Sequence, residues 1–219
     1  MKTLILIPCF NTHQYIEDLL KGIRNSTNND ILIYDDGSSP SPEIDKLSFK
    51  GVNILRNNIN KGKGYVLLEG FKYAIKNNYT HILTIDSDLQ HNPNEINRFI
   101  NLNYEVDFAL GCRKLSKPMP IHRILSNTLT SFIISTLKNK KIKDSQCGFR
   151  RYKTSSINIE SFNEYGYLFE TELLLNNIHE KSKIENVPIS TIYNDSKSSI
   201  NNVGDTIKFI KVIMRYIFA

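Results

Sequence analysis

The stretch His81-Ile82-Leu83-Thr84-Ile85-Asp86-Ser87-Asp88 decides how this chain folds. Its first five residues are mainly apolar or β-branched, and a short run of that kind predicts a buried strand. Two carboxylates follow at once, separated by a single residue. A buried strand that ends in paired acids is typical of an α/β sheet, in which ligands bind outside the carboxyl ends of the strands.

The same pattern recurs on both sides of this stretch. Apolar runs of strand length lie at residues 3–7, 30–34, 52–55, 81–85 and 106–110, and helical patterns lie at 14–24, at 65–76 and after Pro93. This alternation predicts an α/β fold whose central sheet is mostly parallel, with helices on both faces. One rim of that sheet then collects Asn11, Asp35, Asp36, Asp86 and Asp88.

Beyond Gly111 the pattern changes without an evident linker, repeat or low-complexity tract. Helices are predicted at residues 121–137, 168–180 and 203–218, and strands at 146–152 and 184–192. We therefore predict a single domain over residues 1–219.

Positive charge is concentrated in one segment. The net charge is +6, and residues 111–153 hold eleven Lys/Arg and one acid, whereas the rest of the chain holds 17 basic and 21 acidic residues. Such a local cationic field attracts the phosphates of nucleotides, lipids, membranes or nucleic acids. A solvated basic face is the plainer alternative.

The three cysteines, Cys9, Cys112 and Cys147, form neither a metal-ligand pair nor a disulfide framework, which predicts a reducing, cytoplasmic location. The N-terminal apolar run reaches polar Asn11 without a small-residue cleavage site, so it is interpreted as a strand and not as a signal peptide. No stretch reaches the roughly 18 apolar residues that span a bilayer.

Asp86 and Asp88 are the candidate metal ligands and catalytic carboxylates, and Gln90 adds a side-chain amide to the same loop as a further candidate for the metal. Mg²⁺ or Mn²⁺ prefers oxygen ligands and usually takes few carboxylates together with substrate phosphates. Such a metal would neutralise charge on a departing nucleoside diphosphate. The structural alternative is an Asx turn at the end of a strand.

Several other residues are candidates for binding a nucleotide. Carboxylates at Asp35 and Asp36 can accept hydrogen bonds from a ribose or a base, although a β-turn explains them equally well. The glycines around Lys63 precede a helix whose N-terminus favours an anion, but the Walker pattern is absent. The end of the first strand contributes possible walls for the base: Pro8, Phe10 and Asn11.

Two arginines stand out in the cationic segment. Arg113 and Arg123 carry forked donors that bind phosphate oxygens bidentately, and they are candidates for holding a diphosphate or an acceptor phosphate. A surface charge is the alternative for each.

Together these motifs resemble glycosyltransferase family 2. The first half supplies I-P-C-F-N (7–11), D-D-G-S-S (35–39), N-K-G-K-G (60–64), D-S-D-L-Q-H (86–91) and G-C-R (111–113). The second half resembles the polyprenyl- and dolichyl-phosphate sugar synthase branch, through D-S-Q-C-G-F-R (144–150), F-E-T-E (169–172), V-P-I (187–189) and I-Y-N-D-S-K-S-S (192–199). The similarity extends over nearly the whole chain.

The resemblance implies a GT-A fold, a nucleotide-sugar donor, a divalent metal and inversion at the anomeric carbon. It implies a nucleotide-sugar-binding half at 1–112 and an acceptor-binding half at 113–219. Donor contacts would fall at Pro8, Phe10, Asn11, Asp36 and Lys63, metal and diphosphate contacts at Asp86, Asp88 and Gln90, and acceptor or diphosphate contacts at Arg113, Arg123, Ser126 and Lys197. Many relatives carry an acid after the Asn of the first motif, where this chain has Thr12 and His13.

The acceptor decides whether a base is needed. A polyprenyl phosphate is already ionised near pH 7 and needs none, whereas a sugar hydroxyl of a glycan requires a general base. Asp144, Glu170 and Glu172 are the candidates for that base. A helix-end charge or a buried ion pair is the alternative for the two glutamates.

The helices at 121–137 and 203–218 have apolar faces beside basic residues, which suits peripheral contact with the cytoplasmic face of a membrane, although core packing is the alternative. A nucleic-acid-binding module is disfavoured, because no aromatic residues are interleaved with the Lys/Arg cluster. A sugar nucleotidyltransferase should carry a glycine-rich, basic loop after the first strand, and Pro8-Cys9-Phe10-Asn11 is not such a loop.

Overall fold

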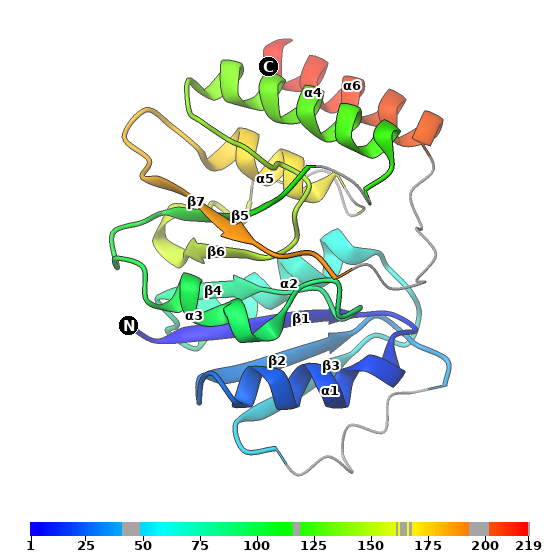
Figure 1. Ribbon diagram of the computed structural model, residues 1–219, viewed down its shortest axis with the longest axis vertical. Helices are drawn as coiled ribbons and strands as arrows, with labels where there is room; N and C mark the ends of the chain where they lie inside the picture. The colour runs from blue at the N-terminus through cyan, green and yellow to red at the C-terminus, as the bar shows by residue number, and fades with distance from the viewer. Residues whose placement is uncertain are drawn as a thin grey trace.

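The computed structural model describes residues 1–40, 49–115, 119–160, 162, 166, 168–192 and 202–218, without the side chains of 202–208 and 218. Its strands form one seven-stranded sheet in the order β3-β2-β1-β4-β6-β5-β7 (Figure 1). The strands are β1 (Thr3–Cys9), β2 (Asp30–Asp35), β3 (Val52–Arg56), β4 (His81–Thr84), β5 (Phe108–Arg113), β6 (Arg150–Lys153) and β7 (Ile184–Ile189).

One strand breaks the parallel arrangement. Strands β3, β2, β1 and β4 are mutually parallel, and β5 pairs in parallel with β7. Strand β6 lies antiparallel between β4 and β5. Because β6 opposes both neighbours, β4 and β5 run in the same direction, and their carboxyl ends share one edge of the sheet.

Helices cover both faces of the sheet, as the sequence predicts. Helix α1 (His13–Arg24) and the short α3 (Asn97–Ile100) lie on one face, and α2 (Lys63–Lys76) and α5 (Phe169–Asn177) lie on the other. Helices α4 (Ile121–Lys138) and α6 (Asn202–Phe218) pack outside α5 (Figure 1).

The alternation of apolar residues within the strands builds two separate cores. In β1, Leu4 and Leu6 join the core beneath α2, whereas Ile5 and Ile7 join the core beneath α1. All four side chains are fully buried. This two-sided burial explains why the strands read as continuous apolar runs and confirms the predicted α/β class.

Several predicted boundaries differ from those of the structure. The strand predicted at 184–192 ends at Ile189, and the strand predicted at 106–110 spans Phe108–Arg113. Pro93 opens a 3₁₀ turn, η2 (Pro93–Ile96), before the four-residue α3 begins. The helix predicted at 168–180 ends at Asn177. The strand predicted at 146–152 begins only at Arg150, because the Gln146 amide donates to the Asp144 side chain, 3.2 Å away, in place of a neighbouring strand. Residues 144–149 therefore form a loop.

Candidate active site

The carboxyl ends of β1, β2, β4 and β5 bring the predicted residues to one edge of the sheet. The register aligns Cys9 at the end of β1 with Asp35 at the end of β2. Asp86 follows β4, and Arg113 ends β5. The loop 144–149 also lies at this edge, because it leads into the start of antiparallel β6.

Asp86 is the centre of a cluster of charges. Its Oδ1 lies 2.7 Å from Nζ of Lys63, in the first turn of α2, and its Oδ2 lies 3.7 Å from Nε2 of His91. Glu170 of α5 also approaches Lys63, with Oε2 at 3.5 Å from Nζ. Lys63 thus links a carboxylate of one half of the chain to a carboxylate of the other.

Both members of this ion pair are strongly held in their charged forms. Burial alone would lower the pKa of Lys63, but the charges of Asp86 and Glu170 outweigh burial and raise that pKa above its usual range. Burial alone would raise the pKa of Asp86, but Lys63 and His91 hold it well below its usual range. The cluster therefore presents a fixed, ionised carboxylate.

Asp88 has the opposite electrostatic character. Burial and the negative charge of Asp86 both raise its pKa above the usual range. Its Oδ1 accepts a hydrogen bond from the backbone N–H of Gln90 at 3.0 Å, which shapes the turn. An additional cation beside Asp88 would relieve the repulsion between the two carboxylates.

Glycine at position 148 allows the loop 144–149 to lie against Asp86. A Cβ built on Gly148 would overlap Oδ1, Oδ2 and Cγ of Asp86. No side chain fits between the loop and the carboxylate, so Gly148 helps to fix where Asp86 points. The sequence gives no local signal for this role of Gly148, because Asp86 lies 62 positions earlier, after β4.

Gly148→Ala is expected to reduce sugar transfer by about a hundredfold, because displacing a site carboxylate by about 1 Å has an effect of that size. The measurement is kcat/KM together with the thermal unfolding midpoint. Gly166→Ala is the matched control, since a Cβ at Gly166 meets nothing within 4 Å. Equal rates for Gly148→Ala and the wild type would contradict this role for Gly148.

Asp36 holds the loop that carries Lys63. The Asp36 carboxylate accepts hydrogen bonds from Nδ2 of Asn57 at 2.7 Å, from the Lys61 amide at 2.9 Å and from the Gly62 amide at 2.8 Å. Gly62 has a φ of 95°, which favours glycine. Asp36 and Asp86 thus bracket residues 61–63, so at least part of the role of Asp36 is to position this loop.

The segment that follows β1 is tied to the neighbouring loops. The backbone N–H of Asn11 donates to Oγ of Ser38 at 2.8 Å. Oγ1 of Thr12 lies 2.7 Å from Oγ of Ser87, the residue that separates Asp86 from Asp88 in the sequence. Asp35 pairs with Arg56 at 2.9 Å and is buried. Pro8 is half-buried, and Phe10 is exposed at the rim, where a planar base can pack against it.

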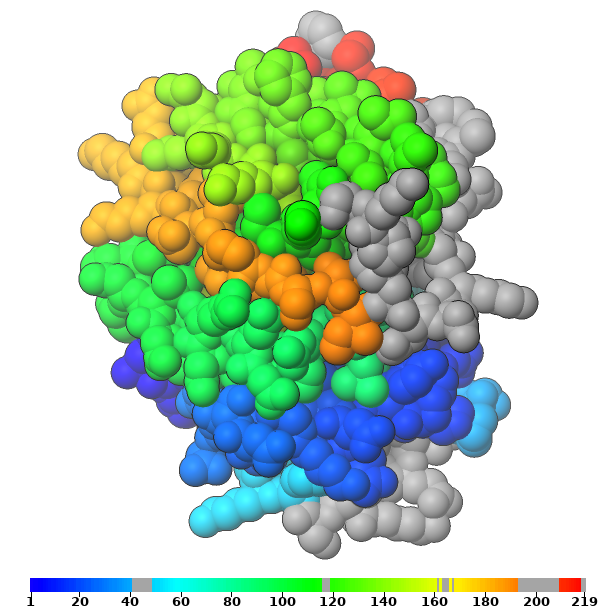
Figure 2. Space-filling view, viewed as in Figure 1, coloured from blue at the N-terminus to red at the C-terminus, as the bar shows by residue number. Residues whose placement is uncertain are grey.

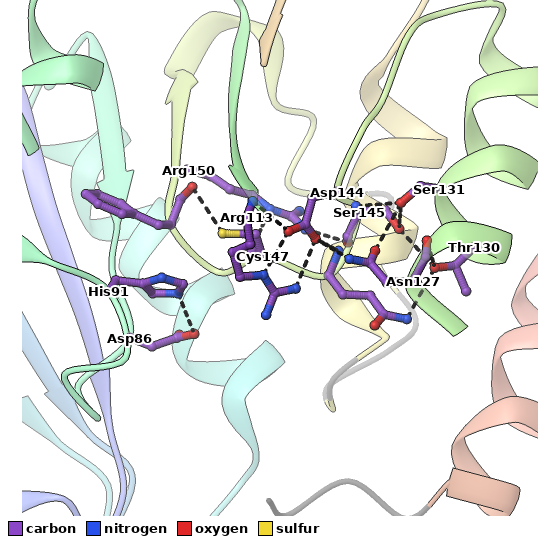
Figure 3. A network of polar contacts seen from close by, with 12 residues as sticks. Asp86, His91, Arg113, Asn127, Thr130, Ser131, Asp144, Ser145, Cys147 and Arg150 are labelled. Atoms are coloured by element: carbon purple, nitrogen blue, oxygen red, sulfur yellow. Dashed lines mark hydrogen bonds and ion pairs between the residues drawn. The ribbon is translucent and has the colours of Figure 1, made fainter. Parts of the chain in front are cut away.

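Arg113 and Asp144 form a bidentate ion pair at the same edge (Figure 3). Nε and Nη2 of Arg113 donate to the two carboxylate oxygens of Asp144, at 2.8 Å and 3.0 Å. Burial alone would raise the pKa of Asp144, but the hydrogen bonds and charge of Arg113 lower it. The negative charge of Asp86 also contributes to raising the pKa of Arg113, so Arg113 interacts electrostatically with the cluster around Asp86.

The remaining predicted residues are more dispersed. Arg123 is half-buried in the first turn of α4, and Oγ of Ser126 lies 3.4 Å from Nε2 of Gln146. Glu172 pairs with Arg215 of α6 at 3.8 Å, so Glu170 is the glutamate of α5 that joins the cluster around Lys63. Lys197 lies outside the described residues.

The residues present fit a magnesium or manganese ion that is completed by a substrate. Within the described part of the chain, no group of three His, Cys, Asp or Glu side chains could hold a metal. Mg²⁺ commonly needs only one or two carboxylates, with waters and phosphate oxygens as the other ligands. Lys63 and His91 both lie close to the oxygens of Asp86, so a metal bound at Asp86 would have to displace one of them.

Comparison with known proteins shows which family the chain belongs to. The profile described as "Glycosyl transferase family 2" matches residues 4–166, which is most of the chain. The chain belongs to this family. The predicted resemblance is thereby confirmed, and its polyprenyl-phosphate branch is represented among the relatives of the chain.

Two similar proteins align with most of the chain. An uncharacterized protein of Methanocaldococcus jannaschii is 30% identical over 97% of this chain and 98% of its own length. The UDP-N-acetylglucosamine–dolichyl-phosphate N-acetylglucosaminyltransferase of Methanococcus voltae is 29% identical over 87% of this chain and 86% of its own length.

Solved structures of other sugar-transferring enzymes have the same fold as this chain. Glucosyl-3-phosphoglycerate synthase of Mycobacterium tuberculosis, in complex with Mn²⁺, uridine diphosphate and phosphoglyceric acid, superposes with a TM-score of 0.72. The alignment covers 98% of this chain and 78% of that chain at 14% identity, so the likeness concerns the fold alone. The GT-A architecture expected from the sequence is confirmed.

Proposed function

We propose that this family 2 glycosyltransferase moves a hexose from a UDP- or GDP-sugar to a polyprenyl-phosphate-type lipid, with inversion at the anomeric carbon. The observation that carries the proposal is the cluster of Asp86, Asp88 and Lys63 at the edge of the sheet where Arg113 also ends its strand. Negative groups that suit a cation thus adjoin positive groups that suit phosphates. The relatives named for lipid-phosphate acceptors support the choice of acceptor.

The donor would bind across residues 1–112 and the acceptor across 113–219. Phe10 and Asn11 would contact the base or ribose, with Pro8 and Asp35 behind them. Asp36 would contribute through the loop that carries Lys63. Asp86, Asp88 and Gln90 would hold Mg²⁺ or Mn²⁺, which when bound offsets the charge of the diphosphate.

The reaction is a single displacement. An oxygen of the lipid phosphate forms a bond to the anomeric carbon while the bond from that carbon to the diphosphate oxygen breaks, and the nucleoside diphosphate leaves with the electron pair. The attacking phosphate is already ionised, so no proton has to be removed. The protein would mainly orient the two reactants and stabilise the developing charge.

The contacts of the candidate bases favour a phosphate acceptor over a glycan hydroxyl. Asp144 is fully buried and paired with Arg113, Glu170 approaches Lys63, and Glu172 pairs with Arg215. A general base must reach the proton that it abstracts. Each carboxylate already has a cationic partner, and this supports an acceptor that needs no base.

Arg123→Ala is expected to raise the KM for a polyprenyl phosphate by about tenfold or more while changing the KM for the nucleotide sugar little, because removing a charge-assisted hydrogen bond has roughly that effect. Steady-state kinetics with each substrate varied in turn measure the two constants. The opposite order of effects would assign Arg123 to the diphosphate of the donor.

The overall activity is tested with purified protein, a panel of UDP- and GDP-sugars, Mn²⁺ and either a polyprenyl phosphate or a glycan. We expect one donor to yield a sugar-phosphate lipid and an excess of chelator to stop its formation. Transfer to the glycan alone would contradict the proposed lipid-phosphate acceptor. Full turnover in the presence of chelator would contradict the proposed requirement for a metal.

A further inference from the structure

Lys63 stands between two acidic side chains that come from different halves of the chain. Its Nζ lies 2.7 Å from Oδ1 of Asp86 and 3.5 Å from Oε2 of Glu170. All three side chains are largely withdrawn from solvent, with exposed fractions of 21% for Lys63, 28% for Asp86 and 11% for Glu170. One ammonium group therefore serves two partly desolvated carboxylates, and it lies closer to Asp86 than to Glu170.

Glu170 is the less satisfied of these two carboxylates. A charge-assisted N–H···O bond is normally about 2.7–2.9 Å long, so the contact of 3.5 Å to Lys63 is a weak one. Among the described residues, Lys63 is the only cationic side chain that forms an ion pair with Glu170. Glu170 lies in the first turn of α5, where a helix favours negative charge, and its carbonyl oxygen accepts a hydrogen bond from Nη1 of the fully buried Arg150 at 3.4 Å. The Glu170 carboxylate is thus well anchored and can accept a closer cation.

Lys63 can change its partner without movement of the backbone. The loop that precedes it is anchored, because the Asp36 carboxylate accepts hydrogen bonds from the backbone N–H groups of Lys61 and Gly62. A lysine ammonium, in contrast, is a compact charge on a flexible four-carbon stem. Because both carboxylates already lie within reach of Nζ, rotation of side-chain bonds is enough to bring the ammonium closer to Glu170.

His91, the other neighbour of Asp86, has no such freedom. Its Nε2 lies 3.7 Å from Oδ2 of Asp86 (Figure 3). The His91 side chain is buried, and its ring packs against that of Phe149 with the centroids 5.6 Å apart. The backbone of His91 also forms an isolated β-bridge with Thr191. A cation that binds to Asp86 is therefore expected to displace Lys63 and to leave His91 in place.

We propose that Lys63 is a positioning residue that exchanges its partner. It neutralises Asp86 in the free protein and passes to Glu170 when Mg²⁺ or Mn²⁺ binds at Asp86 and Asp88. This exchange rests on the proposed function, which includes the metal. Without Glu170, the displaced ammonium would be left partly buried and without a counter-ion, which is costly. Glu170 therefore makes it easier for Lys63 to leave Asp86.

The exchange connects the two halves of the chain. Figure 2 shows the N-terminal segment, in blue, in the lower part of the molecule and α4, in green, in the upper part. Asp86 belongs to the proposed donor half at 1–112, and Glu170 belongs to the proposed acceptor half at 113–219. Helices α2 and α5, which carry Lys63 and Glu170, pack against the same core. A change of partner by Lys63 would therefore make Glu170 respond to binding at Asp86.

The test is a titration of the full chain with Mn²⁺ alone, in which electron paramagnetic resonance measures the free ion. Lys63→Met should bind Mn²⁺ about tenfold more tightly than the wild type, because no ammonium competes for Asp86. Glu170→Gln should bind it about tenfold more weakly, because Lys63 then has no second partner. Lys72→Met is the matched control and should bind like the wild type, since Lys72 also lies on α2 and pairs with a carboxylate, that of Glu69, at 2.7 Å.

The double variant Lys63→Met/Glu170→Gln distinguishes exchange from the simple effect of removing charges near a cation. With no ammonium to receive, Glu170 should no longer matter, so the double variant should match Lys63→Met to within about twofold. An effect of Glu170→Gln that is equally large with and without Lys63 would overturn the exchange.

The thermal unfolding midpoint shows whether Lys63→Met folds. If it does not fold, a crystal structure of the wild type with bound Mn²⁺ decides the question. Lys63 should then pair with Glu170, and a Lys63 that remains paired with Asp86 beside the bound ion would overturn the exchange.

The exchange and the proposed function fail in different ways. The Mn²⁺ titration contains neither donor nor acceptor, so opposite shifts for Lys63→Met and Glu170→Gln support the exchange even if a lipid phosphate is not the acceptor. A wild type that transfers sugar to a polyprenyl phosphate, but whose Mn²⁺ affinity neither substitution changes, would overturn the exchange and leave the transfer in place. Absence of Mn²⁺ binding by both the wild type and Lys63→Met would also overturn the exchange.

Discussion

Asp88→Ala is expected to reduce sugar transfer by roughly a thousandfold or more, the scale seen when a group that stabilises transition-state charge is removed. The fold should survive, because Asp88 is only half-buried and its carboxylate is destabilised by burial and by the charge of Asp86. The isosteric Asp88→Asn should therefore be at least as stable as the wild type at pH 7. Turnover with the preferred donor and the thermal midpoint measure the two effects.

Glu105→Gln provides the control for removing a carboxylate. Glu105 pairs with Lys153 at 3.0 Å, its side chain is 54% exposed, and it lies before β5, at the opposite end of the strands from Asp88. This control should retain wild-type turnover. Stabilisation by Mn²⁺ with a nucleoside diphosphate should also disappear in Asp88→Ala, and its persistence would place the metal elsewhere.

Asp144→Ala is expected to destabilise the protein by about 3 kcal/mol, because removing one partner of a buried ion pair leaves the other charge uncompensated. Arg113 would remain with a side chain only 17% exposed, and Asn127 would lose its acceptor. For a chain of this size the thermal midpoint should fall by roughly 10 °C. Urea unfolding monitored by circular dichroism gives the free energy.

The double variant Arg113→Met/Asp144→Ala separates the ion pair from simple loss of packing. It should be more stable than Asp144→Ala alone, since no buried charge is left without a partner. A double variant as unstable as the single one would contradict the ion-pair explanation.

The pKa of Asp144 is lowered in the folded protein, so the stability that this carboxylate contributes is present at neutral pH and is lost as the pH falls below about 4.

The sequence could predict the features of the site that depend on local pattern. Asp86 and Asp88 directly follow a buried strand, and parallel strands bring their carboxyl ends together. The order of strands and helices in the sequence therefore predicts that the acidic residues meet at one edge of the sheet. Figure 1 shows that order realised in the sheet. Family 2 membership then followed from the spacing of several short motifs.

Contacts between distant segments could not be predicted in this way. The loop 144–149 reaches Asp86 only because β6 inserts antiparallel between β4 and β5, and no local pattern encodes that insertion. The sequence predicts Asp36 as a contact of the nucleotide, but it does not reveal that the same carboxylate accepts hydrogen bonds from the backbone of residues 61 and 62. The apolar residues of α4 were visible in the sequence, but which of them face solvent depends on Asp144 and Ser145.

The position of β6 also affects how the chain can fold. Strands β1 to β4 can assemble from the first 84 residues, but the free side of β4 is paired only by residues 150–153. Until that segment is synthesised and docks, β4 exposes a row of unpaired amide and carbonyl groups, which is a template for intermolecular pairing. A nascent or truncated chain that ends before residue 150 should therefore aggregate, and completing the sheet should be a slow, non-local step.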